Sequence, residues 1–234
     1  MRRVVEPEIL DGLSPVDPQA EASRRDLRRL NVIMGHSGIL SRALRRHLEA
    51  ARVSSRPLRV VELGAGDGTL MLRLARRWSA TGLTAEVTLL DRQNLVSMET
   101  HRAFAALDWS VESVVTDVVT WLEQSSSTVD LMLTNLFLHH FQDNPLRALL
   151  GLVAKKTNLF IACEPRRSPV ALTASRLLGL MGCNAVTRHD AIVSVRAGFA
   201  DNELTALWLS ETPWELSEHS AGLFSHCFVA TRHG

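Results

Sequence analysis

The 234-residue sequence contains no tyrosine, and aromatic residues make up only 5% of it. A proton relay in this protein must therefore use histidine, aspartate, glutamate, cysteine or water. The sequence also lacks an apolar run of about 18 residues, so no transmembrane helix is expected. The N-terminal stretch MRRVVEPEILDG has no apolar core of the kind found in signal peptides, and we expect a cytoplasmic protein.

The net charge is small and cysteines are few. The formal net charge is +1, which leaves no overall electrostatic footprint for nucleic acid. The three cysteines, Cys163, Cys183 and Cys227, are odd in number, far apart and without metal-ligand spacing, which fits a reducing compartment. No Asp/Asp/Asn metal set is visible. We therefore expect no metal, no nucleic acid and no membrane partner, and leave a homodimer open.

The most informative segment is Leu58–Gly68, LRVVELGAGDG. An apolar strand runs to Glu62 and is followed by glycines at alternate positions, Gly64, Gly66 and Gly68. Glycine lets the backbone approach a ligand closely because it has no Cβ. The helical run TLMLRLARRW comes next, so the segment reads as strand, glycine loop and helix.

An acidic residue, Asp91, ends the next apolar strand. Strand, glycine loop, helix, strand and acid together are typical of a nucleoside-binding βαβ unit. A dinucleotide loop would place its third glycine at Thr69, so the spacing disfavours NAD. A glycine-rich turn in any α/β protein is the alternative, but Glu62 and Asp91 favour a ligand site.

This arrangement resembles motif I of the class I S-adenosylmethionine-dependent methyltransferases. The resemblance covers residues 58–164 well and implies S-adenosylmethionine as the cofactor. It implies cofactor-binding roles for one set of residues: Glu62, Gly64, Ala65, Gly66, Gly68, Asp91, Asp117, Val118 and Asn135. In it, Glu62 receives the ligand's ammonium group and Asp91 takes both ribose hydroxyls.

Three residues of this set follow later strands. The resemblance implies that Asp117 and the backbone N–H of Val118 contact the adenine, and that Asn135 lies under the methionine part of the cofactor. An N-cap role for Asp117 in the helix after it is the alternative, and the two roles are compatible.

The segment NLFLHHFQD supplies the catalytic candidates. In phenolic O-methyltransferases, a histidine at the position matching His139 removes the proton from the substrate hydroxyl. The same LHH pattern occurs in C-methyltransferases, and His139 could instead only pack in its loop while His140 points to solvent. Glu164, at the end of the fifth strand, is expected to face the same crevice and is the second catalytic candidate.

The N-terminal region is expected to be helical. Asp17-Pro18 reads as an N-cap followed by proline at the first helical position, and Gly35 as a stop. The segment RRLNVIMG resembles a lid, from which Asn31, Met34 and His36 are expected to reach the site. The arginine run Arg24, Arg25, Arg28 and Arg29 fits a solvated helix face better than a basic patch.

Two further groups follow the fifth strand. Arg166 and Arg167 precede an expected helix at 168–180, where cations oppose the helix dipole and invite an anionic ligand, although solvated loop arginines are the simpler interpretation. We expect substrate contacts from Met34, His36, His140 and Arg166. His189 and Asp190 are assigned to the surface or the cap, because adjacent residues on a helix do not face each other.

Apolar strands at 58–63, 86–91, 111–116, 129–134 and 157–163 alternate with helical segments and predict a parallel sheet. The C-terminal segment reads as an antiparallel hairpin turning around Ala221 and Gly222. The resemblance then implies an α/β, Rossmann-like, seven-stranded sheet in the order 3-2-1-4-5-7-6. We expect a helical lid at 1–55, and a methyltransferase domain at 56–234 with a helical cap around 165–210.

These observations predict an S-adenosylmethionine-dependent methyltransferase of secondary metabolism acting on a small molecule. O-methylation of an aromatic or polyketide-like hydroxyl is favoured, with C-methylation of a quinone- or polyketide-like substrate as the alternative. A non-catalytic S-adenosylmethionine-binding module is a third interpretation. An aminopropyl transferase shares this fold but needs an acid-rich site for its polycationic substrate, which the histidines and arginines here disfavour.

Overall fold

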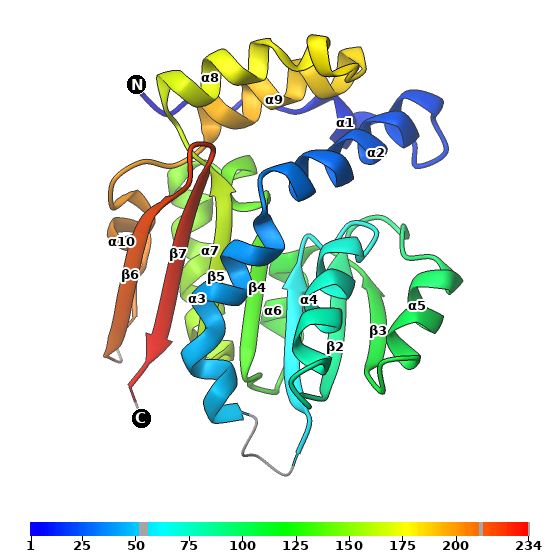
Figure 1. Ribbon diagram of the computed structural model, residues 1–234. Helices are drawn as coiled ribbons and strands as arrows, with labels where there is room; N and C mark the ends of the chain where they lie inside the picture. Colours follow the sequence, from blue (N-terminus) through cyan, green and yellow to red (C-terminus); the bar gives the residue numbers. More distant parts are fainter. Residues whose placement is uncertain (52–55, 211–212, 234) are drawn as a thin grey trace.

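The computed structural model describes residues 1–51, 56–210 and 213–233. A seven-stranded sheet in the order β3-β2-β1-β4-β5-β7-β6 forms the centre of the molecule (Figure 1). Its strands are β1 (Leu58–Leu63), β2 (Ala85–Asp91), β3 (Ser110–Val115), β4 (Leu131–Asn135), β5 (Leu159–Pro165), β6 (Trp214–Ala221) and β7 (Ser225–Arg232). Strands β1 to β5 pair in parallel, and β7 pairs antiparallel with β5 and β6. The predicted strand order and hairpin are confirmed.

Helices cover both faces of the sheet. The helices are α1 (Ile9–Gly12), α2 (Pro18–Ile33), α3 (His36–Ala51), α4 (Thr69–Ser79), α5 (Met98–Ala105), α6 (Val118–Gln124), α7 (Asp143–Lys156), α8 (Pro169–Arg176), α9 (Ala185–Ala197) and α10 (Glu203–Leu207), with 3-10 turns η1 (Leu138–His140) and η2 (Leu178–Met181). Helices α3, α4 and α5 pack on one face, and α6, α7 and α10 on the other. No helix among the described residues is long and apolar enough to cross a membrane.

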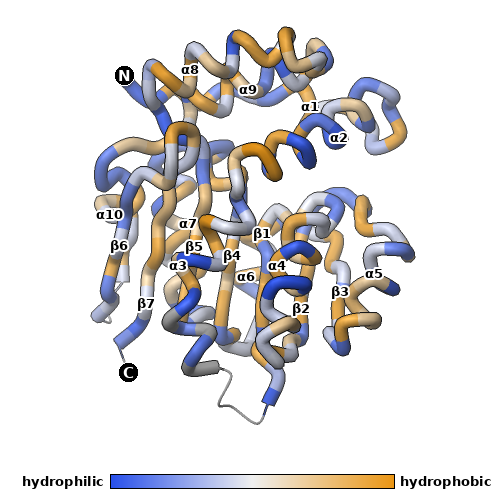
Figure 2. The backbone as a smooth tube through the Cα atoms, in the orientation of Figure 1, coloured by the Kyte–Doolittle hydropathy of each residue, from blue (hydrophilic) through white to orange (hydrophobic). Residues whose placement is uncertain are grey.

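The core consists of two apolar layers separated by the sheet. Successive strand residues point to opposite faces, so Val60 packs in the layer with α4 and Val61 in the layer with α7. Hydrophobic residues therefore follow the central strands almost without interruption (Figure 2). Such continuous apolar runs are typical of parallel strands buried on both faces.

A separate group of helices, α1, α2, α8 and α9, lies beyond the carboxyl ends of the parallel strands (Figure 1). Asp17 caps α2, accepting hydrogen bonds from Gln19 N at 2.7 Å and Ala20 N at 3.4 Å, with Pro18 at the first helical position. Gly35, at φ +70°, separates α2 from α3. These end signals are confirmed.

The N-terminal helices do not all behave as a lid. Leu40 and Leu44 of α3 are fully buried in the core against the sheet, so α3 is part of the packed fold. The expected lid role stays a prediction for α1 and α2. The expected boundary near residue 55 falls at 52–55, outside the described residues.

Two helices, those expected at 95–107 and 168–180, have other bounds than the sequence predicted. The expected helix 95–107 begins only at Met98, because the Ser97 side chain accepts a hydrogen bond from Thr100 N at 3.1 Å. The expected helix 168–180 ends at Arg176 and continues as η2. The later start of α5 leaves the segment after β2 free of helix, and Gln93 and Leu95 of that segment line the cavity described below.

Candidate active site

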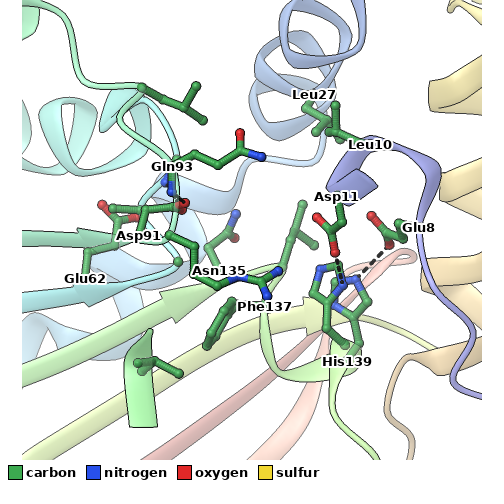
Figure 3. A pocket seen from close by; sticks show the side chains of 18 of the residues that line it. Glu8, Leu10, Asp11, Leu27, Glu62, Asp91, Gln93, Asn135, Phe137 and His139 are labelled. Carbon is green, nitrogen blue, oxygen red and sulfur yellow. Dashed lines mark hydrogen bonds and ion pairs between the residues drawn. The ribbon is translucent and has the colours of Figure 1, made fainter. Parts of the chain in front are cut away.

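A cavity of about 930 Å³ lies at the carboxyl ends of the parallel strands. Figure 3 shows Glu62 and Asp91 at one end of it and Glu8 and His139 at the other. Its walls include most of the predicted site residues: Glu62, Gly64, Ala65, Gly66, Asp91, Asp117, Val118, Asn135, His139 and His140. Asn31, predicted from the N-terminal helix, also lines it. The fold thus brings together residues that are far apart in the sequence.

Backbone geometry explains the glycines. Gly64 has φ +69°, and a Cβ there would lie 2.5 Å from Cδ2 of the Phe137 ring. Gly68, at φ +72°, is the N-cap of α4 and does not line the cavity. A side chain at Gly64 would therefore be strained and would collide with the cavity wall.

Glu62 is buried at the floor of the cavity, with 2% of its surface exposed. Its Oε2 has no hydrogen-bond partner among the described residues. Burial raises the pKa of Glu62 well above its ordinary value, and the nearby charges of Asp67 and Asp91 add to this effect. A buried acid without a partner is costly, and a cation from a ligand would relieve that cost.

Asp91 holds the glycine loop in place. Its Oδ2 accepts a hydrogen bond from Gly66 N at 2.8 Å, and its Oδ1 accepts one from Gln93 N at 2.9 Å. Each carboxylate oxygen has a further lone pair, so contacts to two ribose hydroxyls remain open. Asp91 is half-buried at the cavity wall, where a nucleoside could reach it.

The adenine candidates lie on the same wall. Asp117 is exposed and caps α6, with Oδ1 accepting from Val119 N at 2.9 Å. The N-cap alternative is therefore observed, and the adenine contact stays a prediction. Asn135 is 9% exposed, lines the cavity, and its Oδ1 has no partner among the described residues.

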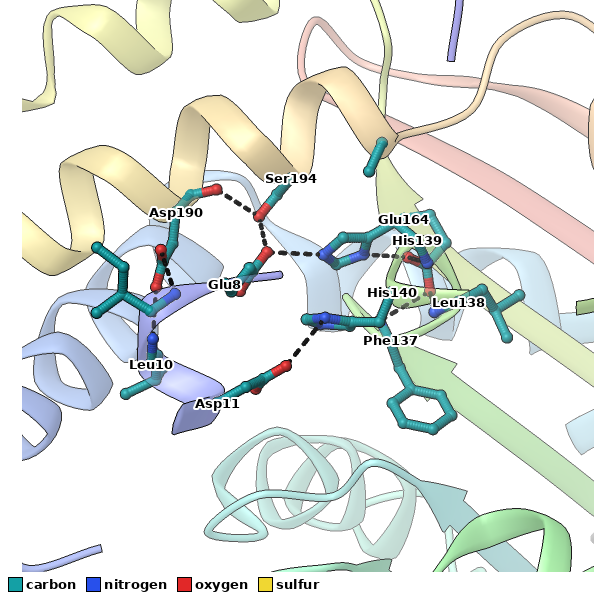
Figure 4. A network of polar contacts seen from close by, with 12 residues as sticks. Glu8, Leu10, Asp11, Phe137, Leu138, His139, His140, Glu164, Asp190 and Ser194 are labelled. Atoms are coloured by element: carbon teal, nitrogen blue, oxygen red, sulfur yellow. Dashed lines mark hydrogen bonds and ion pairs between the residues drawn. The ribbon is translucent and has the colours of Figure 1, made fainter. Parts of the chain in front are cut away.

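The opposite end of the cavity contains a buried chain of acids and a histidine (Figure 4). His139 Nδ1 donates to Glu164 Oε2 at 2.8 Å, and Nε2 donates to Glu8 Oε1 at 3.2 Å. Burial alone would lower the pKa of His139, but the hydrogen bonds to Glu164 and Glu8 outweigh it and raise the pKa to about 9. His139 is therefore an imidazolium held between two carboxylates at neutral pH.

Glu164 lies behind this histidine and does not line the cavity, contrary to the expectation that it faces the crevice. It is fully buried, and its Oε1 accepts from the backbone N–H groups of Phe137 and Leu138, both at 3.0 Å. Burial would raise the pKa of Glu164, but hydrogen bonds from His139 and the backbone lower it. Glu164 therefore fixes η1 and the His139 ring.

No motif in the sequence marks the N-terminal residues that line the cavity, which include Glu8 and Asp11. Glu8 also accepts a hydrogen bond from Ser194 Oγ of α9, and Asp11 contacts His140 Nδ1 at 3.2 Å. Asp190 of α9 accepts hydrogen bonds from the first backbone N–H groups of α1, at Ile9 and Leu10, both at 2.9 Å. Only the folded chain reveals these contacts, because Glu8 and His139 are 131 positions apart.

The contacts of Asp190 also correct the expectation for the pair His189 and Asp190. His189 Nδ1 lies 2.9 Å from Asp190 Oδ1, although adjacent helical residues were expected not to meet. Asp190 is 5% exposed, so it is a buried anchor for α1 rather than a surface residue of the cap.

Three expected substrate contacts do not line the cavity: Met34, His36 and Arg166. His36 is fully buried, its Nε2 lies 3.1 Å from Ser225 Oγ, and burial lowers its pKa to about 4. Arg166 Nη1 donates to Gly222 O at 3.3 Å, at the turn of the hairpin. Met34 follows the last residue of α2, where the chain has already turned toward α3. His140 is the one member of that set in the cavity wall.

One group of described residues has ligand atoms close enough together for a metal ion. Glu8, His139 and His140 each offer an atom within 4.8 Å of the others. Glu8 and His139 already satisfy each other by a hydrogen bond. The expectation of no metal rested on a missing Asp/Asp/Asn set, and this different set becomes visible only in the fold.

Comparison with known families gives a match in the central part of the chain. Residues 60–157 match a protein-family model described as "Methyltransferase domain". The match spans the glycine loop, Asp91, Asp117 and the LHH segment. No curated protein matches the sequence.

Several solved structures have a similar fold. The plantazolicin methyltransferase BpumL in complex with SAH has a TM-score of 0.64 at 11% identity, covering 93% of this chain and 92% of that one. The mitomycin 7-O-methyltransferase MmcR has 0.58 at 19%, covering 96% and 60%. An O-methyltransferase family protein from Burkholderia thailandensis has 0.51 at 16%, covering 85% and 59%. The chain thus spans about three fifths of the last two, and at these identities the likeness is one of fold.

Proposed function

We propose that the protein, whose residues 60–157 match a methyltransferase domain model, transfers the methyl group of S-adenosylmethionine to a hydroxyl group of a small molecule. The match to the domain model and the shared fold support the enzyme class and the cofactor. The aromatic or polyketide-like nature of the acceptor is the further step. The mitomycin 7-O-methyltransferase, which shares the fold, supports the O-methyl assignment.

The observation that carries the proposal is the buried Glu62 with its unpartnered carboxylate oxygen beside the glycine loop. Burying this unpaired carboxylate costs free energy, and a cationic ligand group that binds to it offsets the cost. The ammonium of S-adenosylmethionine is such a group. Asp91, with lone pairs to spare, lies along the same wall for the ribose. The volume of about 930 Å³ leaves room for a second small molecule beside the cofactor.

S-adenosylmethionine supplies an electrophilic methyl group on a good leaving group, so the protein mainly aligns the acceptor and removes its proton. We place the acceptor hydroxyl where the Glu8 carboxylate now meets His139 Nε2, which requires the Glu8 side chain to turn away. Replacing a carboxylate by a neutral hydroxyl removes one of the two charges that raise the pKa of His139. Burial continues to lower that pKa, toward the range in which histidine accepts a proton.

Glu164 acts through His139. It binds Nδ1–H at 2.8 Å and thereby turns Nε2 toward the cavity. This is a positioning role, because Glu164 has no surface in the cavity. C-methylation remains the alternative, and NMR of the product distinguishes the two, since a methyl on oxygen resonates apart from one on carbon.

The cofactor part of the proposal is tested by thermal denaturation. S-adenosylhomocysteine should raise the melting temperature, because a ligand that binds only the native state stabilises it. NAD and NADP should leave it unchanged. A shift with NAD and none with S-adenosylhomocysteine would overturn the proposal. Cofactor binding without turnover on a panel of phenols and enols would instead favour a binding module.

A further inference from the structure

The proposed reaction changes the surroundings of the Glu8 carboxylate. The acceptor hydroxyl takes the place of this carboxylate at Nε2 of His139, where the two side chains now meet at 3.2 Å. The O–CH3 bond forms as the S–CH3 bond of the cofactor breaks, and the hydroxyl proton passes to Nε2. His139 must therefore be neutral when the acceptor binds, and Glu8 loses the cation with which it is paired in the unliganded protein.

The backbone on either side of Glu8 is tied to the rest of the fold (Figure 4). Before it, the Arg3 guanidinium donates to Ala197 O of α9 and to Phe141 O, both at 2.8 Å. After it, the first two backbone N–H groups of α1 donate to Asp190, both at 2.9 Å. Glu8 therefore stays at the acceptor end of the cavity when an acceptor enters, and we expect its side chain alone to turn.

The protein offers Glu8 no replacement for the lost cation. The Glu8 side chain is 10% exposed and lines the cavity, and its other hydrogen bond comes from Ser194 Oγ, a neutral hydroxyl. Within the described parts of the chain, the ion pairs of arginine side chains reach other acids, namely Asp26, Asp67, Asp130, Asp143 and Glu203. Removing the charged partner of a buried carboxylate is strongly destabilising. A cation is therefore needed from the ligand.

Asp11, an acid of the same N-terminal segment, is in a different situation. Its side chain is 46% exposed, and it contacts His140 Nδ1 at 3.2 Å. Because water screens an exposed carboxylate, Asp11 gains little from a further cation. The requirement for a cationic ligand group thus falls on Glu8.

We propose that the acceptor carries a protonated amine close to the hydroxyl that is methylated, and that Glu8 selects the acceptor by pairing with this amine. The inference rests on the function proposed above, because it assumes that the hydroxyl binds at His139. The hydroxyl and the amine each form a hydrogen bond of about 2.8 Å to one of two adjacent side chains, so roughly two to four atoms separate them. The substrate class is a hydroxylated amine such as an aminoalkyl phenol.

The test uses phenols that differ in the charge of one side group. The aminomethyl phenols carry an ammonium at neutral pH, the hydroxymethyl phenols are neutral and nearly isosteric, and the hydroxybenzoates are anions of similar size. The ortho and meta isomers of each cover two separations. Methyl transfer from S-adenosylmethionine is measured as kcat/KM, and binding to the complex with S-adenosylhomocysteine is measured by calorimetry. Wild type should favour an aminomethyl phenol over its hydroxymethyl partner by about tenfold or more, and should disfavour the anions.

Two variants assign this preference to Glu8. Glu8→Gln keeps the size and the hydrogen-bonding capacity of the side chain but removes its charge, so the two phenols should then differ by no more than about twofold. Glu6→Gln is the matched control, because Glu6 lies on the same segment, lines the cavity and is exposed. It should keep the wild-type preference. The ratio is taken within each variant, so a general loss of activity or stability cancels.

The outcomes separate this inference from the proposed function. Equal treatment of the amine and neutral phenols by wild type would overturn the inference alone, and so would a preference that survives in Glu8→Gln or disappears in Glu6→Gln. Failure of every amine probe to bind or react would also overturn it. A methyl group found on nitrogen by NMR would overturn the hydroxyl acceptor, and the inference with it. If S-adenosylhomocysteine does not bind wild type, the cofactor assignment itself fails.

Discussion

Asp91 shows how one side chain can serve both the fold of a loop and a ligand. Its two oxygens bind Gly66 N and Gln93 N, so it shapes the glycine loop before any nucleoside arrives. Asp91→Ala should weaken S-adenosylhomocysteine binding by roughly tenfold or more, about 1.4 kcal/mol or above, as measured by calorimetry.

A second variant separates the two roles of Asp91. Asp91→Asn keeps one acceptor oxygen but loses the charge, so its affinity should fall between those of wild type and Asp91→Ala. Circular dichroism of each variant should match wild type, since Asp91 is only half-buried and lies at the end of its strand. Unchanged affinity in Asp91→Ala would remove this residue from the site.

The adjacent histidines provide a matched pair for the catalytic step. His139 is 2% exposed and is held by Glu8 and Glu164, whereas His140 is half-buried and paired with Asp11. If His139 accepts the proton, His139→Ala should lower kcat by roughly 10²-fold or more with cofactor affinity nearly unchanged. His140→Ala should have a much smaller effect in the same steady-state assay. Equal, small effects would assign catalysis to alignment alone.

At the scale of single elements, the N-terminal helix α1 depends on an anchor in α9. Asp190 accepts hydrogen bonds from two unpaired N–H groups at the start of α1, which the short helix cannot satisfy itself. Asp190→Ala should release α1 locally at a cost of about 1 to 3 kcal/mol. Hydrogen exchange at the Ile9 and Leu10 amides should accelerate, and the KM for the acceptor should rise.

The control for this anchor is the neighbouring histidine. The His189 side chain is 51% exposed and touches Asp190 from the solvent side. His189→Ala should therefore leave the exchange of the α1 amides close to wild type. Fast exchange in both variants would mean that α9 itself has been disturbed, and slow exchange in Asp190→Ala would contradict the anchoring role.

Elements with a strong local signal could be predicted from the sequence. The strand that ends in Glu62 and Leu63, and the loop that follows it, have a hydrophobic run, glycines and an acid within eleven residues, and each signal is local. The end signals of α2 are equally local, since Asp17 and Pro18 act on the next helical turn. The strand order needed the family resemblance, because pairing between distant strands leaves little trace in one sequence.

The acceptor end of the cavity could not be predicted in the same way. Its key contact joins Glu8 to His139, and nothing near Glu8 in the sequence marks it as a partner of a buried histidine. The prediction that His36 contacts the substrate was wrong for a related reason. A polar residue near an expected lid suggests a functional role, although its real partners are distant in the sequence. In the fold it packs beneath the hairpin, where it touches Ser225.

At the scale of the whole molecule, two buried histidines make the stability depend on pH in opposite directions. The folded pKa of His36 is lowered by burial to about 4, so the unfolded chain binds a proton more readily below pH 6.5, and stability falls as the pH drops. The folded pKa of His139 is raised to about 9 by its two carboxylate partners, against the effect of burial. Its contribution is fully present below pH 6.5 and is lost as the pH rises through 9.

The part of the stability that these two histidines contribute should therefore be greatest near pH 6.5 in the unliganded protein. A rise from pH 6.5 to 9.5 should remove up to about 3 kcal/mol through His139, seen as a fall of several degrees in melting temperature. His139→Gln keeps a similar volume but cannot titrate, so its curve should be flatter than wild type over this range. Ionisation of buried cysteines at high pH affects both proteins alike and cancels in the comparison. Parallel curves would show that the Glu8–His139–Glu164 chain is not charged in the way its hydrogen bonds indicate.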